Sequence, residues 1–273
     1  MNFLQALILG VVQGLTEFLP VSSSAHLALV PYWFQWNLSE ESVFLFGVLV
    51  QMGTLISVII YFRKDILQIL VAFFNGIFRG KLFEDPKAHL GWMILLATVP
   101  AAVAGALMKD TVESAFNNPR AIALFLLVTA ILLFAAEKVP AKDRDLREMN
   151  WKDAVWIGIA QAVALLPGIS RSGATISGGL FRKFTRRESS RFAFLISIPI
   201  MIGAGALSVL DITDWNAFRP LLPALICATL TAAVVGYFAI KWMLNYINKK
   251  PFTIFSIYCS VIGIFTFILT FIR

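Results

Sequence analysis

The sequence predicts an all-α polytopic membrane protein, built as an inverted-topology repeat with six full spans and two re-entrant helix–loop–helix segments. Three observations lead there. First, the 273 residues are 59% hydrophobic and only 14% charged, whereas a soluble domain carries about 25% charged residues. Second, the apolar residues gather in charge-free blocks. Third, two distant stretches of the chain resemble each other.

The charge-free blocks predict the six full spans. An α-helix needs about 20 apolar residues to cross the hydrocarbon core of a bilayer. Uninterrupted stretches such as "VFLFGVLVQMGTLISVIIY" meet that length. The expected spans are residues 43–62, 90–108, 120–137, 190–209, 220–244 and 252–272.

Charge and cysteine content exclude other classes of protein. The net charge of +7 does not indicate nucleic-acid binding here, because loop Lys and Arg residues orient membrane proteins. Cys227 and Cys259 each lie inside an apolar span, so we expect packing residues rather than a disulfide framework. No basic segment with a cleavage site opens the chain, so no removable signal peptide is expected.

The two similar stretches are "GVVQGLTEFLPVSSSAH" (10–26) and "GIAQAVALLPGISRSGA" (158–174). With an offset of 148 residues, identical residues coincide at four positions. A proline in each copy also aligns if the offset is reduced by one residue. The coincident pairs are Gly10 and Gly158, Gln13 and Gln161, Ser22 and Ser170, and Ser24 and Ser172. We therefore predict one membrane domain over 1–273, with repeat halves of about 1–140 and 150–273.

A proline interrupts each copy partway through its apolar stretch, Pro20 in the first and Pro167 in the second. Proline disrupts the helix before it, and non-helical backbone survives at membrane depth only where protein or a cavity covers it. We therefore expect residues 3–36 and 153–187 to be re-entrant segments. Three full spans per half is an odd number, so the second half is expected to be inverted.

The distribution of basic residues fixes the expected orientation. The predicted topology places residues 63–89, 138–152, 182–191 and 241–250 on one side, and these segments hold 18 of the 23 Lys and Arg residues. Cytoplasmic loops carry the positive excess. Both termini are therefore expected outside.

The two interrupted tips gather polar residues that an apolar chain otherwise avoids. A serine before an apolar helical run is a natural N-cap, and the helix then aims free N–H groups and its positive dipole end outward. Two such ends and an arginine suit an anion with several oxygens, and phosphate fits best. The candidate residues are Gln13, Glu17, Ser22, Ser23, Ser24 and His26 in the first tip, and Ser170, Arg171, Ser172, Gly173 and Thr175 in the second.

A carboxylate in this group indicates chemistry rather than binding, because it repels an anion. Glu17 is suited to act as a general base, to orient His26 or to bind a divalent cation. A serine or histidine nucleophile beside a carboxylate is the usual arrangement for covalent catalysis, and Arg171 would stabilise phosphoryl-transfer charge. Two alternatives stay open: a purely structural ion pair between Glu17 and Arg171, and a proton-coupled lipid transporter that uses Glu17 as its switch.

Two motifs carry a resemblance to a known family. "GLTEFLPVSSSAH" (14–26) and "PGISRSGATISGG" (167–179) resemble the signatures of the undecaprenyl-pyrophosphate phosphatases, also called bacitracin-resistance proteins. The resemblance covers the whole chain in length, span order and motif spacing. Two positions depart from it: Gln13 stands where many members have Glu, and Ala25 stands where Gly is usual.

The resemblance implies a phosphatase of the bacterial plasma membrane whose active site opens to the outer face. Such an enzyme hydrolyses undecaprenyl pyrophosphate to undecaprenyl phosphate and inorganic phosphate, which recycles the carrier for peptidoglycan synthesis and confers bacitracin resistance. It implies that Glu17, His26 and Arg171 are essential and that Ser23 or His26 is the nucleophile.

The remaining tip hydroxyls would contact phosphate, with Gln13 in support. The resemblance also implies a divalent cation, Mg²⁺ or Ca²⁺, with Glu17 as its ligand. The alternative function becomes a proton-coupled transporter or flippase of polyprenyl phosphate. The expected partners are the lipid substrate and the bilayer, without nucleic acid, and a homodimer is left open.

Overall fold

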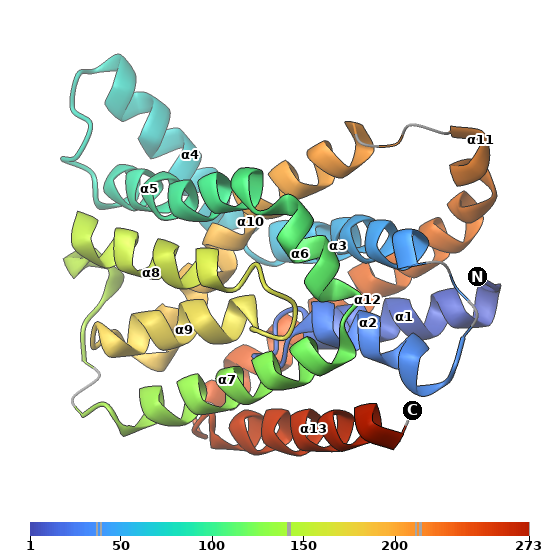
Figure 1. Ribbon diagram of the computed structural model, residues 1–273. Coiled ribbons are helices and arrows are strands. Elements are labelled where there is room, and N and C mark those ends of the chain that lie inside the picture. Colours follow the sequence, from blue (N-terminus) through green and yellow to red (C-terminus); the bar gives the residue numbers. More distant parts are fainter. Residues whose placement is uncertain (37, 39, 141–142, 211, 213–214, 273) are drawn as a thin grey trace.

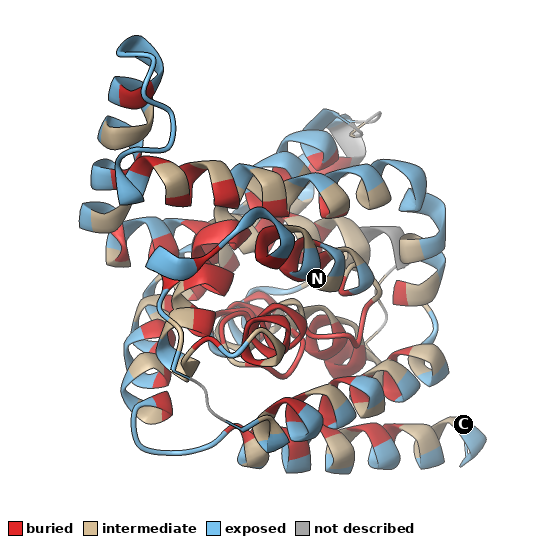
Figure 2. Ribbon diagram, turned by 90° about the vertical axis from the view of Figure 1, so that its left-hand side faces the viewer, coloured by how far each residue is buried: buried red, intermediate tan, exposed pale blue. Residues whose placement is uncertain are grey.

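A computed structural model describes residues 1–36, 38, 40–140, 143–210, 212 and 215–272. Helices make up most of this part of the chain, and no strand occurs in it beyond one isolated bridge between Arg144 and Phe184. The axes of most helices lie nearly parallel or antiparallel to one another (Figure 1). Buried residues concentrate at the centre of the bundle, and the outer faces of the peripheral helices are exposed (Figure 2).

Among the described residues, six helices are long and apolar enough to cross a membrane, which confirms the predicted spans. Large apolar side chains such as Leu230, Ile131 and Phe265 lie on their exposed faces, as expected where the surroundings are lipid. The six are α3 (Glu40–Tyr61), α5 (Pro86–Leu107), α7 (Pro119–Lys138), α10 (Arg186–Leu210), α12 (Leu222–Ile247) and α13 (Thr253–Ile272).

Two pairs of shorter helices occupy the segments predicted to be re-entrant. They are α1 (Phe3–Thr16) with α2 (Ser23–Trp33), and α8 (Trp151–Val163) with α9 (Arg171–Phe181). α1 and α8 each end four residues before a proline, Pro20 or Pro167. A proline ring clashes with the helical carbonyl four residues earlier, which explains both ends. Re-entry into a membrane stays a prediction.

The packing of the two halves is reciprocal. α1 of the first half packs on α12 of the second, and α8 of the second packs on α5 of the first. A Cβ on Gly10 would meet the Ala228 carbonyl oxygen at 2.6 Å, and one on Gly158 would meet the Ala97 carbonyl oxygen at 2.6 Å. Equivalent glycines thus permit equivalent close approaches. Figure 1 shows α1 and α8 starting from opposite ends of the bundle. The inverted repeat stays a prediction.

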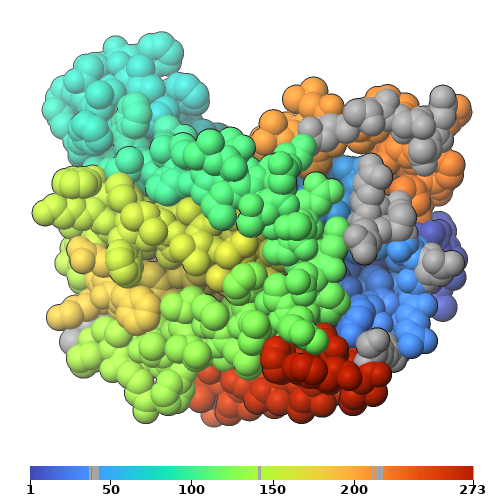
Figure 3. Space-filling model, viewed as in Figure 1, coloured from blue at the N-terminus to red at the C-terminus, as the bar shows by residue number. Residues whose placement is uncertain are grey.

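Five shorter helical elements complete the fold of the described residues, and one of them changes the sequence-based prediction. The predicted loop 63–89 contains the amphipathic helix α4 (Arg63–Phe78), which protrudes with its following loop from the body (Figure 3). Its exposed Leu67, Val71 and Phe74 recur at helical spacing, but the helix is too short to register as a span. The others are α6 (Lys109–Phe116), η1 (Leu146–Glu148), α11 (Trp215–Phe218) and η2 (Arg219–Leu221).

Charged side chains pair where α8 begins, at the end of the bundle opposite the two termini (Figure 1). The fully buried Asp153 carboxylate accepts hydrogen bonds from Arg144 at 2.8 Å and Arg182 at 2.5 Å. Burial by itself raises the pKa of Asp153, but the bonds from Arg144, the Asn150 backbone and Arg182 outweigh it, so the net pKa lies below the usual value. This network fixes the start of the second helix pair.

Candidate active site

The two loops that interrupt the short helix pairs meet at the floor of one cavity of about 360 Å³. Its walls come from α3, α5, α6 and α10. Eight of the eleven residues predicted for the site line this cavity. They are Gln13, Glu17, Ser22, Ser23, Ser24, Ser170, Arg171 and Ser172.

Ser22 shapes the first loop and joins it to the second. Its φ of 69° lies in the left-handed region, which a residue other than glycine adopts only when its surroundings hold it there. Its Oγ caps α2 by accepting from the Ala25 N–H at 3.4 Å, and it also accepts from the Gly168 N–H at 3.2 Å. The cap therefore also links the two tips.

Gly168 makes the turn in the second loop. Its φ is +107°, and a Cβ there would meet the Ile122 carbonyl oxygen at 2.5 Å, so the position requires glycine. Thr129 of α7 holds the turn by donating to the Gly168 carbonyl at 2.8 Å and accepting from the Ser170 N–H at 2.9 Å. Ser170 then caps α9 by accepting from the Gly173 N–H at 3.0 Å.

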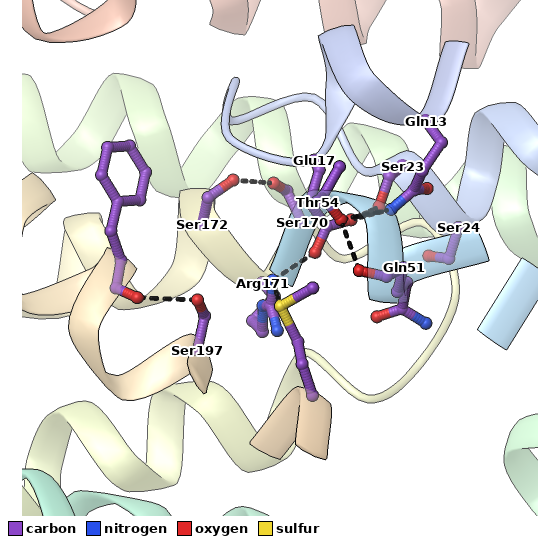
Figure 4. Close-up of polar contacts among 12 residues, drawn as sticks. Gln13, Glu17, Ser23, Ser24, Gln51, Thr54, Ser170, Arg171, Ser172 and Ser197 are labelled. Carbon is purple, nitrogen blue, oxygen red and sulfur yellow. Dashed lines mark hydrogen bonds and ion pairs between the residues drawn. The ribbon is translucent and has the colours of Figure 1, made fainter. Parts of the chain in front are cut away.

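Glu17 is the centre of the polar contacts (Figure 4). Its side chain is almost fully buried, and one oxygen, Oε1, accepts from Arg171 of the second tip. The other oxygen, Oε2, accepts from Ser23 Oγ at 2.5 Å and from Gln13 Nε2 at 2.8 Å. The ion pair left open by the sequence is therefore present. It is one contact of a larger set, because a hydroxyl and an amide from the first tip share the same carboxylate inside a cavity.

Two helix N-termini face the same cavity. α2 begins at Ser23 and α9 begins at Arg171, and both residues line it. The first N–H groups of a helix lack intrahelical partners, and with the helix dipole they favour an anion. The cavity floor thus combines a hydroxyl on a carboxylate, a guanidinium and two positive helix ends, which is a set of groups able to bind and attack a phosphate.

Three predicted site residues lie outside the cavity lining. Gly173 donates to its own N-cap, and Thr175 Oγ1 donates to the Arg171 carbonyl at 2.7 Å within α9. His26 is 4% exposed, with Nδ1 2.7 Å from the Ser22 carbonyl oxygen and Nε2 2.8 Å from the Tyr258 hydroxyl. A carbonyl only accepts, so Nδ1 carries the proton, and in the neutral ring Nε2 accepts from Tyr258. Both nitrogens are thus engaged away from Ser23.

Several residues of the site escaped the sequence analysis. Thr54 of α3 accepts from Gln13 Nε2 at 3.2 Å, and Gln51 of the same helix lines the cavity. Lys109 lines it from the start of α6, and Tyr258 of α13 holds His26. Gln51 and Thr54 carried a signal that was available, because they are polar residues within an apolar span. Tyr258 carried none.

The oxygen atoms of the cavity floor suit a hard cation better than a transition metal. Over the described residues, no three His, Cys, Asp or Glu side chains are grouped to hold a metal. One buried oxygen is left over, however, since Gln13 Oε1 has no hydrogen-bond partner. It belongs to the residue that contacts Glu17. Mg²⁺ is commonly held by one or two carboxylates together with substrate phosphates, and these oxygens fit such a site.

Comparisons with known proteins identify the family of the chain. The family model described as "Bacitracin resistance protein BacA" matches residues 6–265. A protein of Chlorobium phaeovibrioides named undecaprenyl-diphosphatase is 42% identical over 277 residues, which cover 98% of this chain and 97% of the relative. Proteins of the same name from Myxococcus xanthus and Methanobrevibacter smithii are each 39% identical over 98% of this chain. The matched region covers 89% of the first relative and 97% of the second. The chain belongs to the bacitracin resistance protein BacA family.

Proposed function

We propose that this protein is an integral membrane phosphatase that hydrolyses undecaprenyl pyrophosphate to undecaprenyl phosphate and inorganic phosphate. The relatives at about 40% identity bear the name of that activity. The observation that carries the proposal is the hydrogen bond from Ser23 Oγ to Glu17 Oε2, in a cavity that also holds Arg171. A hydroxyl on a carboxylate beside a guanidinium is suited to phosphoryl transfer.

In the first step, Ser23 Oγ attacks the terminal phosphorus and its proton passes to Glu17. The bond from that phosphorus to the bridging oxygen breaks, and undecaprenyl phosphate leaves with the electron pair. Arg171 and the N-terminal ends of α2 and α9 stabilise the charge on the phosphoryl oxygens. Because Arg171 contacts Glu17 in the free protein, substrate binding draws its guanidinium toward the phosphates.

In the second step, water attacks the phosphoserine. Glu17, which gave the proton from Ser23 to the departing undecaprenyl phosphate in the first step, takes a proton from the water. The bond between phosphorus and Ser23 Oγ breaks, and Glu17 returns this proton to Oγ as inorganic phosphate leaves. Ser22, Ser24, Ser170 and Ser172 present hydroxyls around the same cavity and contact the phosphate oxygens.

His26 serves as a positioning residue in this mechanism. It donates to the carbonyl of Ser22, the residue in the left-handed conformation, and so holds the backbone that presents Ser23. This geometry favours Ser23 over His26 as nucleophile, because a phosphorylated His26 would lose the Ser22 or the Tyr258 contact.

A divalent cation, Mg²⁺ or Ca²⁺, is part of the proposal. Glu17 and the unpartnered Gln13 Oε1 would hold it together with the substrate phosphates. When bound, the cation would neutralise phosphate charge.

We place the protein in the bacterial plasma membrane with both termini outside. The paired charges at the start of α8 and the basic segments lie toward the end of the bundle opposite the termini. α3 begins, and α5 and α10 end, toward the terminal side (Figure 1), and these parts line the cavity. The site therefore opens outward, where the reaction recycles the carrier for peptidoglycan synthesis and opposes bacitracin.

Phosphate release from undecaprenyl pyrophosphate by the purified protein tests the proposal. Wild type should release phosphate, and Ser23→Ala should not. Ser260→Ala is the matched control, because Ser260 bonds only its own helix, at the Ser256 carbonyl. No release by folded wild type would reject the phosphatase and favour the proton-coupled transporter or flippase with Glu17 as its switch.

A further inference from the structure

Away from its floor the cavity is mostly apolar, although Gln51, Thr98, Lys109 and Ser208 also line it. Away from the two tips, its walls are formed by small and apolar residues on the facing sides of α5 and α10. On α5 these are Ala101, Ala102, Gly105 and Ala106, and on α10 they are Ile200, Gly203, Ala204 and Leu207. These apolar residues line the same cavity as Arg171 and Ser172.

We call the part of the cavity between these α5 and α10 residues the corridor. Its two glycines, Gly105 and Gly203, leave room in it. A Cβ on Gly203 would meet no atom within 4 Å, and one on Gly105 would meet only Leu165, at an ordinary 3.8 Å. Most other helix glycines differ, since a Cβ on Gly10, Gly53 or Gly158 would collide with backbone oxygen. Gly105 and Gly203 are therefore not required by helix packing, and the space beside them belongs to the cavity.

A second observation shows that the inner end of the cavity is built for a ligand. Gln13 has no exposed surface and lines the cavity, yet its Oε1 has no partner. A buried polar atom left unpaired destabilises the protein by about 1–3 kcal/mol, so it is expected to be satisfied when the site is filled. What fills the site must therefore offer Gln13 Oε1 a hydrogen-bond donor or a cation, and must be apolar where it lies between α5 and α10.

We propose that the corridor between α5 and α10 binds the first isoprene units of the lipid substrate, and that Gly105 and Gly203 set the specificity for a diphosphate that carries a polyprenyl chain over one that carries none. This inference rests on the proposed phosphatase function. The diphosphate lies at the tips, and the chain leaves between the two helices toward the surrounding lipid. Small residues keep the walls far enough apart for a branched hydrocarbon chain.

The test is Gly203→Leu, which adds a side chain where there is room for it and so fills the corridor without disturbing the helix contacts. The measured quantity is the ratio of kcat/KM for undecaprenyl diphosphate to kcat/KM for methyl diphosphate, which has no isoprene unit to place in the corridor. Excluding about two methylene groups of the lipid from burial lowers this ratio about tenfold. Gly105→Leu on the facing helix should lower it similarly. Ala206→Leu is the matched control, since Ala206 is exposed on α10 outside the cavity lining.

The outcomes separate the two proposals. A ratio that falls in both glycine variants and not in Ala206→Leu supports the corridor. An unchanged ratio in Gly203→Leu and Gly105→Leu, with wild type active on both substrates, overturns the corridor and leaves the phosphatase intact. A wild-type protein that releases phosphate from neither substrate rejects the phosphatase and the corridor with it. Because each variant is measured on both substrates, partial loss of folded protein cancels from the ratio.

Discussion

The first and second tips share a backbone design and differ in chemistry. In each, a serine caps a short helix and lies 3.2 Å from a second serine two residues on, Ser22 with Ser24 and Ser170 with Ser172. The two tips differ at the first helical position, because Ser23 begins α2 and Arg171 begins α9. These two residues are related by the same offset as the repeat, and both contact Glu17.

The comparison teaches how a repeat yields an asymmetric site. The shared part supplies two helix ends that favour an anion. The residues that differ between the tips supply different chemical groups, a hydroxyl and a carboxylate on the first tip and a guanidinium on the second. Neither tip holds the full set of groups, so the proposed reaction needs both.

Replacing the carboxylate of the first tip should have the largest effect on activity. Glu17→Gln keeps the shape of the side chain but removes the base that bonds Ser23, so kcat should fall by about 10³-fold, within the range for general acid–base catalysis. Phosphate release by the purified variant is the measurement. Glu84→Gln, a change at an exposed carboxylate paired with Lys81, is the control. A Glu17→Gln protein with wild-type kcat would remove the first tip from the chemistry.

Changing the cation tests the second tip. Arg171→Lys keeps the charge but loses the planar fork that matches phosphate oxygens, and kcat should fall by about 10²-fold, as for loss of one transition-state donor. Arg120→Lys, on α7 outside the cavity lining, controls for the substitution itself. Equal kinetics in Arg171→Lys and wild type would mean that the second tip supplies only charge and not geometry.

The helix starts extend the comparison beyond the tips. α1 begins with an Asn2–Gln5 capping box and α8 with an Asn150–Asp153 box at the same offset, but only Asp153 is held by arginines. Asp153→Asn should lower the free energy of unfolding by roughly 2 kcal/mol, because it weakens charged hydrogen bonds. Thermal unfolding in detergent measures this loss.

The contribution of Asp153 to the free energy of unfolding should depend on pH. Folding lowers the pKa of Asp153, so its contribution is complete above the unfolded value of about 3.9 and is lost as pH falls through the lower folded pKa. The unfolding midpoints of wild type and Asp153→Asn should therefore differ near neutral pH and converge in acid. A difference that persists below the folded pKa would contradict the ionic account.

The smallest expected effect concerns His26, which has the apolar Ala174 as its counterpart in the repeat. Tyr258→Phe removes one hydrogen bond to His26 Nε2, which is worth about 1 kcal/mol, so kcat/KM should fall about fivefold. Tyr246→Phe removes an exposed hydroxyl bonded to the Pro251 carbonyl and serves as control. If the two tyrosine variants behave alike, the hydroxyl of Tyr258 does not position the ring.

Much of the fold follows from local properties of the sequence. The six spans are runs of apolar residues, and the ends of α1 and α8 follow from Pro20 and Pro167, so both were predictable. α4 was not, because its apolar residues fill one face of a helix shorter than a span. The reciprocal packing of α1 on α12 and of α8 on α5 depends on contacts between distant segments, which no local pattern encodes.

The site divides in the same way. Glu17, Arg171 and the serines could be found because charges are rare inside apolar segments and because the repeat marks the tips. The orientation of His26 could not be found, since it depends on Tyr258, 232 residues away. Thr54 could have been found as a polar residue within an apolar span, but its contact with Gln13 depends on the folded chain, which brings α3 beside α1.

The central claim is that Ser23 of the first tip is the nucleophile in a site completed by the second. The most direct measurement is rapid quenching of the purified protein with undecaprenyl pyrophosphate labelled in its terminal phosphate, followed by mass spectrometry of the peptide that contains Ser23 and His26. The predicted result is label on Ser23, absent from Ser23→Ala, which also releases no phosphate. Label on His26, or full phosphate release by Ser23→Ala, would contradict the claim.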